Sequence, residues 1–289
     1  MFTFFDSHTH LMDEKYDGNW NEILKNAASV GVKYITNIGY NKETSYEAVK
    51  IADEARNVNG IEGVFATVGL HPENIDELSE KSLKDNGVAK EDFDFIYELA
   101  KSQKVVAIGE IGLDYHFGYG APNLEEASSP NAKMSDFMKE KQKEVFIHQI
   151  EIANELKLPV VIHSRDADMD MLAVLKEHQI ENGFVMHCFS SSVEVLKEVL
   201  KLGAYVSLAG PVTFKNARSL IDVAKLIPED KLLVETDAPY LTPEPYRGKR
   251  NESAYVVYTA QKIADLRECS LEKISQITTE NAKRFYGIN

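Results

Sequence analysis

Short apolar, β-rich segments alternate with helical patterns along the whole 289-residue sequence. Strands that alternate with helices are typical of parallel pairing with right-handed crossovers. We expect eight strands, at residues 2–6, 33–38, 63–68, 105–109, 159–162, 184–187, 204–207 and 232–235. Helical patterns lie between or after them, at residues 20–29, 44–56, 92–101, 137–156, 169–177, 193–200, 217–226 and in a C-terminal pair that ends near Phe285.

Eight such units in about 250 residues predict an α/β fold in which the strands close into a (β/α)8 TIM barrel. An open doubly wound sheet is the alternative, but no glycine-rich phosphate-binding turn follows the first expected strand. No linker rich in Pro, Gly or Ser divides the sequence, so residues 1–289 are expected to form a single domain. The connections at 72–90 and 115–135 are longer than a barrel requires, and we expect them either to wall its carboxyl end or to be surface excursions.

Metal-binding side chains occur where five of the expected strands end. In extended backbone, side chains two residues apart point the same way, so Asp6, His8 and His10 are expected to share one face. The carboxyl ends of all barrel strands meet at one mouth. The residues that collect there are His8, His10, Glu110, His163, His187 and Asp237. Burying so many polar groups without metal or water would be costly, and the sequence therefore predicts a metal site.

Four imidazoles and two carboxylates suit two divalent ions that share a bridging carboxylate. We expect Glu110 to bridge them. His8, His10 and Asp237 would complete the shell of one ion, and His163 with His187 that of the other. Imidazole ligands favour Zn or Mn, whereas Mg prefers oxygen, so the ion remains open among Mg, Mn and Zn.

Two further carboxylates, Asp6 and Glu235, lie two residues before His8 and Asp237. By strand alternation they are expected to orient the ligands or a bound water. The alternative is a buried polar pair within the barrel layers.

A net charge of −14 excludes a protein that wraps duplex nucleic acid with a globally basic face. Any phosphate-bearing substrate must therefore be held by metal and a few local cations. Arg165 and Arg247 are the main candidates because a guanidinium fork suits a phosphate, and Lys215 and Arg250 are weaker ones. Residues expected to stack on a base or bind phosphate are His71, Tyr115 and His116. His71 precedes a proline, so capping a turn is its alternative role.

The remaining features of the sequence bear on its location. The two cysteines, Cys188 and Cys269, do not make a disulfide framework, and the N-terminus does not resemble a signal peptide. No apolar run approaches the roughly 20 residues that cross a bilayer. We expect a cytoplasmic protein with no membrane association and no obligate protein partner.

The order of the motifs resembles a known family. The sequence is similar to the TatD-family metal-dependent deoxyribonucleases of the amidohydrolase superfamily from Phe5 to the C-terminus. The motifs that carry the resemblance are FDSHTHL, GLHPE, IGEIGLDY, PVVIHSRDA, MHCFS, GPVTFKNA, LLVETDAPYLTP and RGKRNES. Ser253 stands where the family pattern usually has proline, and the segment after Tyr115 looks longer than in compact relatives.

The resemblance implies a (β/α)8 barrel, two divalent metals and hydrolysis of DNA phosphodiesters, typically from the ends of single strands. The family's metal ligands fall on the six residues that the strand ends had already indicated. Two metals can activate a water for attack on phosphorus. Asp237 is the expected general base, with a role as ligand only as the alternative, and Glu110 is the second catalytic residue.

Two other classes of function remain open on the sequence alone. An amidohydrolase that cleaves a small ester, lactone or amide would use the same ions to polarise a carbonyl, and the acidic net charge favours it. A non-catalytic metal carrier or scaffold has no use for open coordination positions, which weighs against this class.

Overall fold

The computed structural model describes residues 2–84, 87–116 and 134–289. Eight parallel strands form one sheet in the order β1 to β8. They are β1 (Phe4–Thr9), β2 (Val32–Ile38), β3 (Gly63–Val68), β4 (Val105–Asp114), β5 (Val160–Arg165), β6 (Phe184–Met186), β7 (Tyr205–Leu208) and β8 (Leu232–Val234). The (β/α)8 architecture predicted from the alternating pattern is confirmed.

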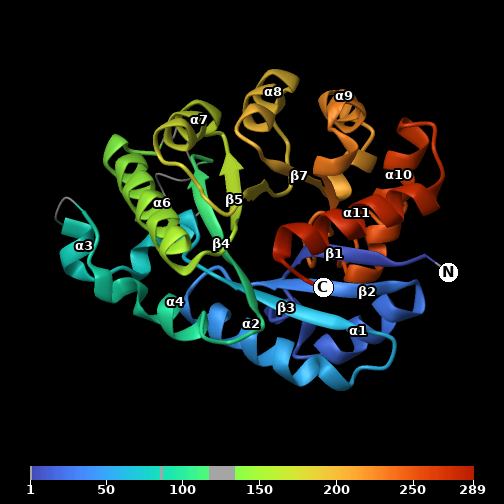
Figure 1. Cartoon of the computed structure of the whole chain (residues 1–289), viewed down its shortest axis with the longest axis horizontal. Helices are drawn as coiled ribbons and strands as arrows, with labels where there is room; N and C mark the ends of the chain where they lie inside the picture. The colour runs from blue at the N-terminus through green and yellow to red at the C-terminus, as the bar shows by residue number, and fades with distance from the viewer. Residues whose placement is uncertain (1, 85–86, 117–133) are drawn as a thin grey trace.

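Helices surround this sheet (Figure 1). The α-helices are α1 (Trp20–Ser29), α2 (Lys42–Glu54), α3 (Glu80–Lys84), α4 (Asp94–Leu99), α6 (Asp136–Leu156), α7 (Asp168–Glu177), α8 (Val193–Lys201), α9 (Arg218–Leu226), α10 (Val256–Leu266) and α11 (Leu271–Tyr286). Short 3-10 helices lie at Glu14–Tyr16, Ala55–Asn57, Pro72–Glu77, Lys90–Phe93, Gly210–Thr213, Glu229–Lys231 and Ser253–Tyr255. None of the described helices is long and apolar enough to cross a membrane.

The long connections differ in how much of them is described. The segment 72–90 contains the 3-10 helix Pro72–Glu77 and the short helix α3. Of the connection expected at 115–135, residues 117–133 lie outside the described part of the chain.

Strands β1 and β8 meet along the seam that closes the barrel. A parallel bridge joins Thr9 to Ala238. The His10 N–H donates to the Ala238 carbonyl at 2.8 Å, and the Asp237 N–H donates to the His8 carbonyl at 2.9 Å. The bonds that close the barrel therefore also bring three of the predicted metal-binding residues together.

An apolar layer fills the barrel interior beneath the predicted site. Phe5 of β1 packs in it with Val161, Val185 and Leu233, which precede His163, His187 and Glu235 by two residues each. Tyr286 of α11 stacks on Phe5 with ring centroids 5.8 Å apart, and α11 lies across the strands near β1 (Figure 1). This layer leaves the carboxyl end of the barrel to the polar residues.

Several strands end later than the apolar runs predicted. β1 extends to Thr9, β4 to Asp114 and β5 to Arg165 rather than to residues 6, 109 and 162. His8, Glu110 and His163 thus lie within strands, because the backbone keeps pairing with its neighbours after the side chains have become polar. The register Gly112↔His163 in the β4–β5 pair is one example.

Gly112 allows this pairing to continue beside the site. Its φ is +144°, and a Cβ there would overlap the carbonyl oxygen of His163.

Gly112→Ala is expected to lower the free energy of unfolding by more than about 2 kcal/mol, because the added Cβ would displace the backbone and the alanine would have to adopt an unfavourable φ. Gly183→Ala is the matched control, since Gly183 also has a positive φ (+86°) but nothing within 4 Å of the added atom. We expect it to cost only about 1 kcal/mol in urea denaturation. Equal losses in the two variants would contradict the steric explanation.

Candidate metal centre

The six residues predicted as metal ligands converge at the carboxyl end of the barrel. Five strands place them. His8 lies in β1, and His10 directly follows that strand. Glu110 and His163 lie in β4 and β5, and His187 directly follows β6. Asp237 follows β8 with φ of +54°, in the left-handed region. His8, His10, Glu110 and His187 are all buried.

One oxygen of Glu110 faces the residues of the β1–β8 seam. Glu110 Oε2 lies 3.4 Å from His8 Nε2 and 3.9 Å from His10 Nε2. Asp237 Oδ1 lies 3.6 Å from His8 Nε2 and 3.4 Å from His10 Nε2. The two imidazole nitrogens are themselves 3.3 Å apart. Four potential ligand atoms thus point at one small volume.

These separations fit a metal shell better than a hydrogen-bond network. Ligands about 2.1 Å from a tetrahedral metal lie about 3.4 Å from one another. Four of the five distances in this set fall between 3.3 and 3.6 Å. His10 Nδ1 is fixed by the Ile38 carbonyl at 2.9 Å, which leaves Nε2 free for the cluster. The donor set therefore fits a divalent cation.

The other oxygen of Glu110 faces a second group of imidazoles. Glu110 Oε1 lies 2.7 Å from His187 Nε2, 2.8 Å from His163 Nδ1 and 3.4 Å from His71 Nε2. His163 Nδ1 and His187 Nε2 are 3.1 Å apart. Glu110 consequently stands between two sets of ligand atoms, one on each carboxylate oxygen.

His71 is predicted to contact substrate, but in the structure it lies beside the cluster itself. Its Nδ1 accepts a hydrogen bond from the Glu73 N–H at 3.1 Å, which caps the 3-10 helix that begins at Pro72. The turn-capping alternative is therefore confirmed. The same bond directs Nε2 toward Glu110, so His71 belongs to the second group of possible ligands.

Asp114 is a site residue that the sequence reasoning missed. Its Oδ2 lies 3.0 Å from His163 Nε2, and its Oδ1 accepts the His116 N–H at 2.8 Å. This contact leaves the other ring nitrogen of His163 to face Glu110. The available signal was spacing, because Asp114 follows Glu110 by four residues on the same strand.

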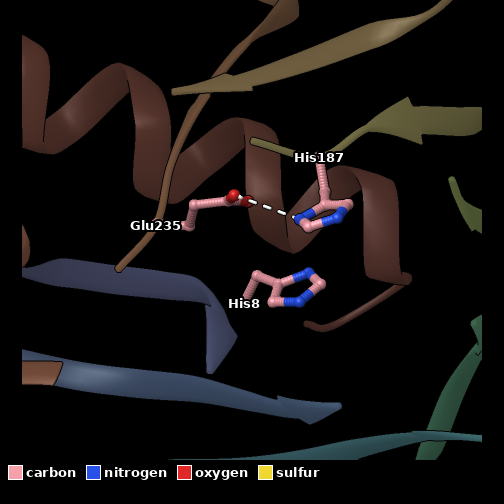
Figure 2. Close-up of side chains that lie close together, drawn as sticks. All are labelled: His8, His187 and Glu235. Carbon is pink, nitrogen blue, oxygen red and sulfur yellow. Dashed lines mark ion pairs between the residues drawn. The ribbon is translucent and has the colours of Figure 1, made fainter. Parts of the chain in front are cut away.

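Glu235 occupies the position that strand alternation predicted. Figure 2 shows its carboxylate beside His187, and Oε1 lies 3.4 Å from His187 Nδ1 while accepting the Cys188 N–H at 2.7 Å. The His187 ring stacks on His8 with centroids 4.0 Å apart. This trio is itself a geometrically possible metal-binding group.

Asp6 does not share that role. Its carboxylate accepts hydrogen bonds from the Thr236 N–H at 2.9 Å and the Thr236 hydroxyl at 2.7 Å. The β1–β2 register shifts between Asp6 and Thr9, so simple alternation fails there. His8 Nδ1 has no hydrogen-bond partner in the described part of the chain. Both oxygens of Asp6 thus bond Thr236 rather than a predicted ligand, so the expectation that Asp6 orients a metal ligand is wrong, while its role toward a bound water stays a prediction.

In the cluster, contacts between carboxylates and imidazoles keep these buried groups charged, although burial favours their neutral forms. Burial opposes ionisation of Glu110, but the charges of His187 and His71 and its imidazole hydrogen bonds hold its pKa well below the usual range. Burial likewise opposes charge on His187, but Glu110 raises its pKa well above normal. Burial opposes ionisation of Asp237, but its contact with His10 and the charges of His8, His187 and His10 together lower its pKa. The carboxylates are thus poised as anionic ligands.

The predicted substrate contacts separate into two groups. The Tyr115 hydroxyl donates to Asp170 at 2.8 Å, and His116 pairs with Asp166 at 2.8 Å, so both engage the chain after β5. Arg165 is exposed.

Arg165 ends β5, two residues after His163. Burial raises the pKa of the Glu73 carboxyl, and the charges of His71, His163 and Arg165 oppose that rise.

The other predicted cations lie toward β8. Arg247 is exposed and stacks over Phe214 at 4.0 Å, whereas Arg250 donates to the Lys15 carbonyl at 2.7 Å. Two histidines lie away from the predicted site: His148 is within α6, and His178 directly follows α7. His148 packs on Phe93, but its buried Nε2 lacks a partner among the described residues, so it is not fully satisfied.

A parallel barrel with clustered imidazoles and carboxylates at the carboxyl ends of its strands defines a metal-dependent barrel enzyme. Residues 5–287 match the family model described as TatD related DNase, and the chain belongs to this family. It is 43% identical over 286 residues to the uncharacterized metal-dependent hydrolase YabD of Bacillus subtilis, with 99% of each chain covered. Identity to the uncharacterized metal-dependent hydrolase YcfH of Escherichia coli is 36% over 288 residues, covering 98% of this chain and 96% of YcfH.

A solved structure leads to the same family. The TatD homologue YJJV of Escherichia coli matches with a TM-score of 0.82 at 25% identity, covering 99% of this chain and 98% of that one. The family resemblance found in the motifs is therefore confirmed. The protein is a metal-dependent hydrolase of the TatD family.

Protons should compete with metal for this cluster, and the competition affects stability. Burial opposes protonation of His163, but hydrogen bonds to Asp114 and Glu110 raise its pKa to about 9. A raised folded-state pKa gives stability that is fully present below the unfolded value of about 6.5 and is lost as pH rises through the folded value. Burial also raises the pKa of Asp6 to about 7, which acts in the same direction.

We therefore expect chelator-treated protein to lose stability as pH rises from 6.5 to 9. Urea denaturation at several pH values measures the slope, and His163→Gln should reduce it, with the pKa of His187, which is also raised, accounting for the remainder. His178→Gln, just after α7, is the control and should retain the slope of the unmodified protein. A slope that is unchanged in His163→Gln would contradict the assignment of this proton.

Proposed function

We propose that the protein is a two-metal deoxyribonuclease that removes nucleotides from the ends of single-stranded DNA. The observation that carries the proposal is the position of Glu110, whose two oxygens each face a separate set of imidazoles. A carboxylate so placed suits two divalent ions a few ångströms apart. The family's description as DNases supports a nucleic-acid substrate.

The residues divide between the two positions. His8, His10 and Asp237 would hold one ion and His163 and His187 the other, with Glu110 shared. His71, at 3.4 Å from Glu110, is positioned to add a ligand to the second. The imidazole-rich sets favour Zn or Mn over Mg.

Ions bound there supply Lewis-acid stabilisation of phosphate charge and lower the pKa of a water. Asp237 is the proposed general base. It stays ionised because its contact with His10 and the charges of the surrounding histidines together keep its pKa low despite burial, and its side chain is 15% exposed. Its carboxylate can thus accept a proton at the edge of the cluster. Glu235, 3.4 Å from the other ring nitrogen of His187, would orient that ring.

The direct test is an end-labelled single-stranded oligonucleotide incubated with chelator-stripped protein to which Mg, Mn or Zn is returned. Metal-dependent shortening, abolished by chelator, is the expected result, and metal analysis should find about two ions per chain. If the oligonucleotide stays intact while a small ester, lactone or amide is cleaved, the alternative amidohydrolase function holds instead.

Glu110→Ala and Asp237→Asn are expected to abolish turnover and to leave the fold intact. Loss of a general base alone costs on the order of 10²–10⁴-fold in rate. Loss of Glu110 should also reduce the bound metal, because the residue contacts both sets. Asp230→Asn, in the 3-10 helix before β8 at the opposite end of the barrel, is the matched control. Full turnover in either remetallated variant would remove this mechanism.

Arg165 is the proposed clamp on a non-bridging phosphate oxygen. Arg165→Ala should raise KM about tenfold with a smaller change in kcat, because a charge-assisted hydrogen bond contributes about 1.5 kcal/mol. Arg165→Lys keeps the charge but loses the planar fork, so we expect an intermediate KM. An unchanged KM in both variants would assign Arg165 to the solvated surface.

A further inference from the structure

Two connections form one rim beside the candidate metal centre. The segment after β7 (209–217) and the segment after β8 (235–252) pack directly on each other, because a Cβ on Gly210 would overlap the Leu241 carbonyl oxygen. The Glu244 N–H donates to the Thr213 hydroxyl at 2.9 Å. The Tyr240 N–H donates to the Asp237 carbonyl at 2.9 Å, which ties this β7–β8 rim to the candidate site.

The exposed charged side chains of the β7–β8 rim are basic, on a protein whose whole chain carries −14. Within residues 209–217 and 235–252, the four cations are all exposed: Lys215, Arg247, Lys249 and Arg250. None of the four carboxylates in these segments is exposed, because Glu235 is buried and Asp237, Glu244 and Glu252 are half-buried. By contrast, the groove over the start of α2, on the side of the barrel where β2 and β3 end, is lined by Glu43, Glu47 and Glu77 with one lysine. A polyanion at the mouth is therefore attracted to the β7–β8 rim.

Aromatic rings lie beneath these cations. Arg247 stacks over Phe214 at 4.0 Å, and Lys249 lies 5.4 Å from the centre of the Tyr246 ring. Tyr246 in turn stacks on Tyr255 with centroids 4.7 Å apart and planes within 6°. Neither Arg247 nor Lys249 has a carboxylate in ion-pair range within the described residues. Their charges are thus available to a ligand.

Cations interleaved with aromatic rings are the arrangement that binds single strands, since the cations follow the phosphates and planar groups stack on bases. We propose that the β7–β8 rim is an extended subsite that holds the nucleotides beyond the scissile phosphate, with the Phe214–Arg247 pair as its central contact. Single-stranded DNA is the occupant, because the surrounding acidic surface opposes a duplex. This inference rests on the proposed function.

The subsite predicts that the enzyme prefers long substrates. Arg247→Ala removes the cation, and Phe214→Leu keeps the apolar packing of this half-buried side chain but removes the ring. In both variants, the ratio of kcat/KM for a 12-nucleotide strand to that for a dinucleotide is expected to fall about five- to tenfold. Arg56→Ala removes an exposed cation after α2, in the connection that leads into β3, and should leave the ratio unchanged.

Binding without hydrolysis separates this inference from the proposed function. Fluorescence anisotropy of a labelled oligo(dT) 12-mer in chelator should show weaker binding in Arg247→Ala, with the slope of log K against log salt reduced by about 0.7. If Arg247→Ala binds the 12-mer more weakly but the unmodified protein shows no nuclease activity, the proposed function is overturned and the subsite is not. Nuclease activity with unchanged length preference and salt slope in both rim variants would overturn the subsite alone.

Discussion

The site depends on one buried carboxylate surrounded by imidazoles. Glu110 is only 4% exposed, yet it is held ionised between His187 and His163 on one oxygen and His8 on the other. An isolated charge in such a place would be too costly to bury, and removing its partners would leave it uncompensated. The histidines are therefore required for the fold to tolerate Glu110, and the same arrangement creates the two sets of ligand atoms. The same side chain, Glu110, thus determines both which residues the fold must bury around it and where metal ions could bind.

The geometry of the barrel explains why these residues meet at all. The β8–β1 seam is closed by two backbone hydrogen bonds, and each involves a residue of the cluster or its neighbour: His10 to Ala238 and Asp237 to His8. A barrel that opened at this seam would separate Asp237 from both histidines. Beneath it, the apolar layer around Phe5 keeps water from the lower half of the barrel. The polar site is thus confined to the carboxyl end by the packing below it.

Much of this arrangement could be predicted from the sequence, because strand number and the chemistry at strand ends are local properties. The alternating pattern identified eight strands, and polar residues after apolar runs identified the six residues that meet. The prediction failed where the outcome depends on register between strands. The bulge after Asp6 turned that carboxylate toward Thr236, and Asp114 became a partner of His163 only because β4 continues past Glu110. Spacing along one strand does not reveal either contact.

The placement of charged residues on the fold could not be predicted from the amino-acid composition. A net charge of −14 argues against a nucleic-acid substrate when it is taken as an average. The structure shows that the average is unevenly distributed, because the connections after β7 and β8 bring Lys215, Arg247 and Lys249 to one rim beside the candidate site. If the proposed function holds, these acidic surroundings would act as a selective feature, since they would repel a duplex along most of the surface and favour a flexible strand that contacts only a small basic area. On that proposal, an acidic enzyme binds a polyanion because its few unpaired cations lie beside the candidate metal centre.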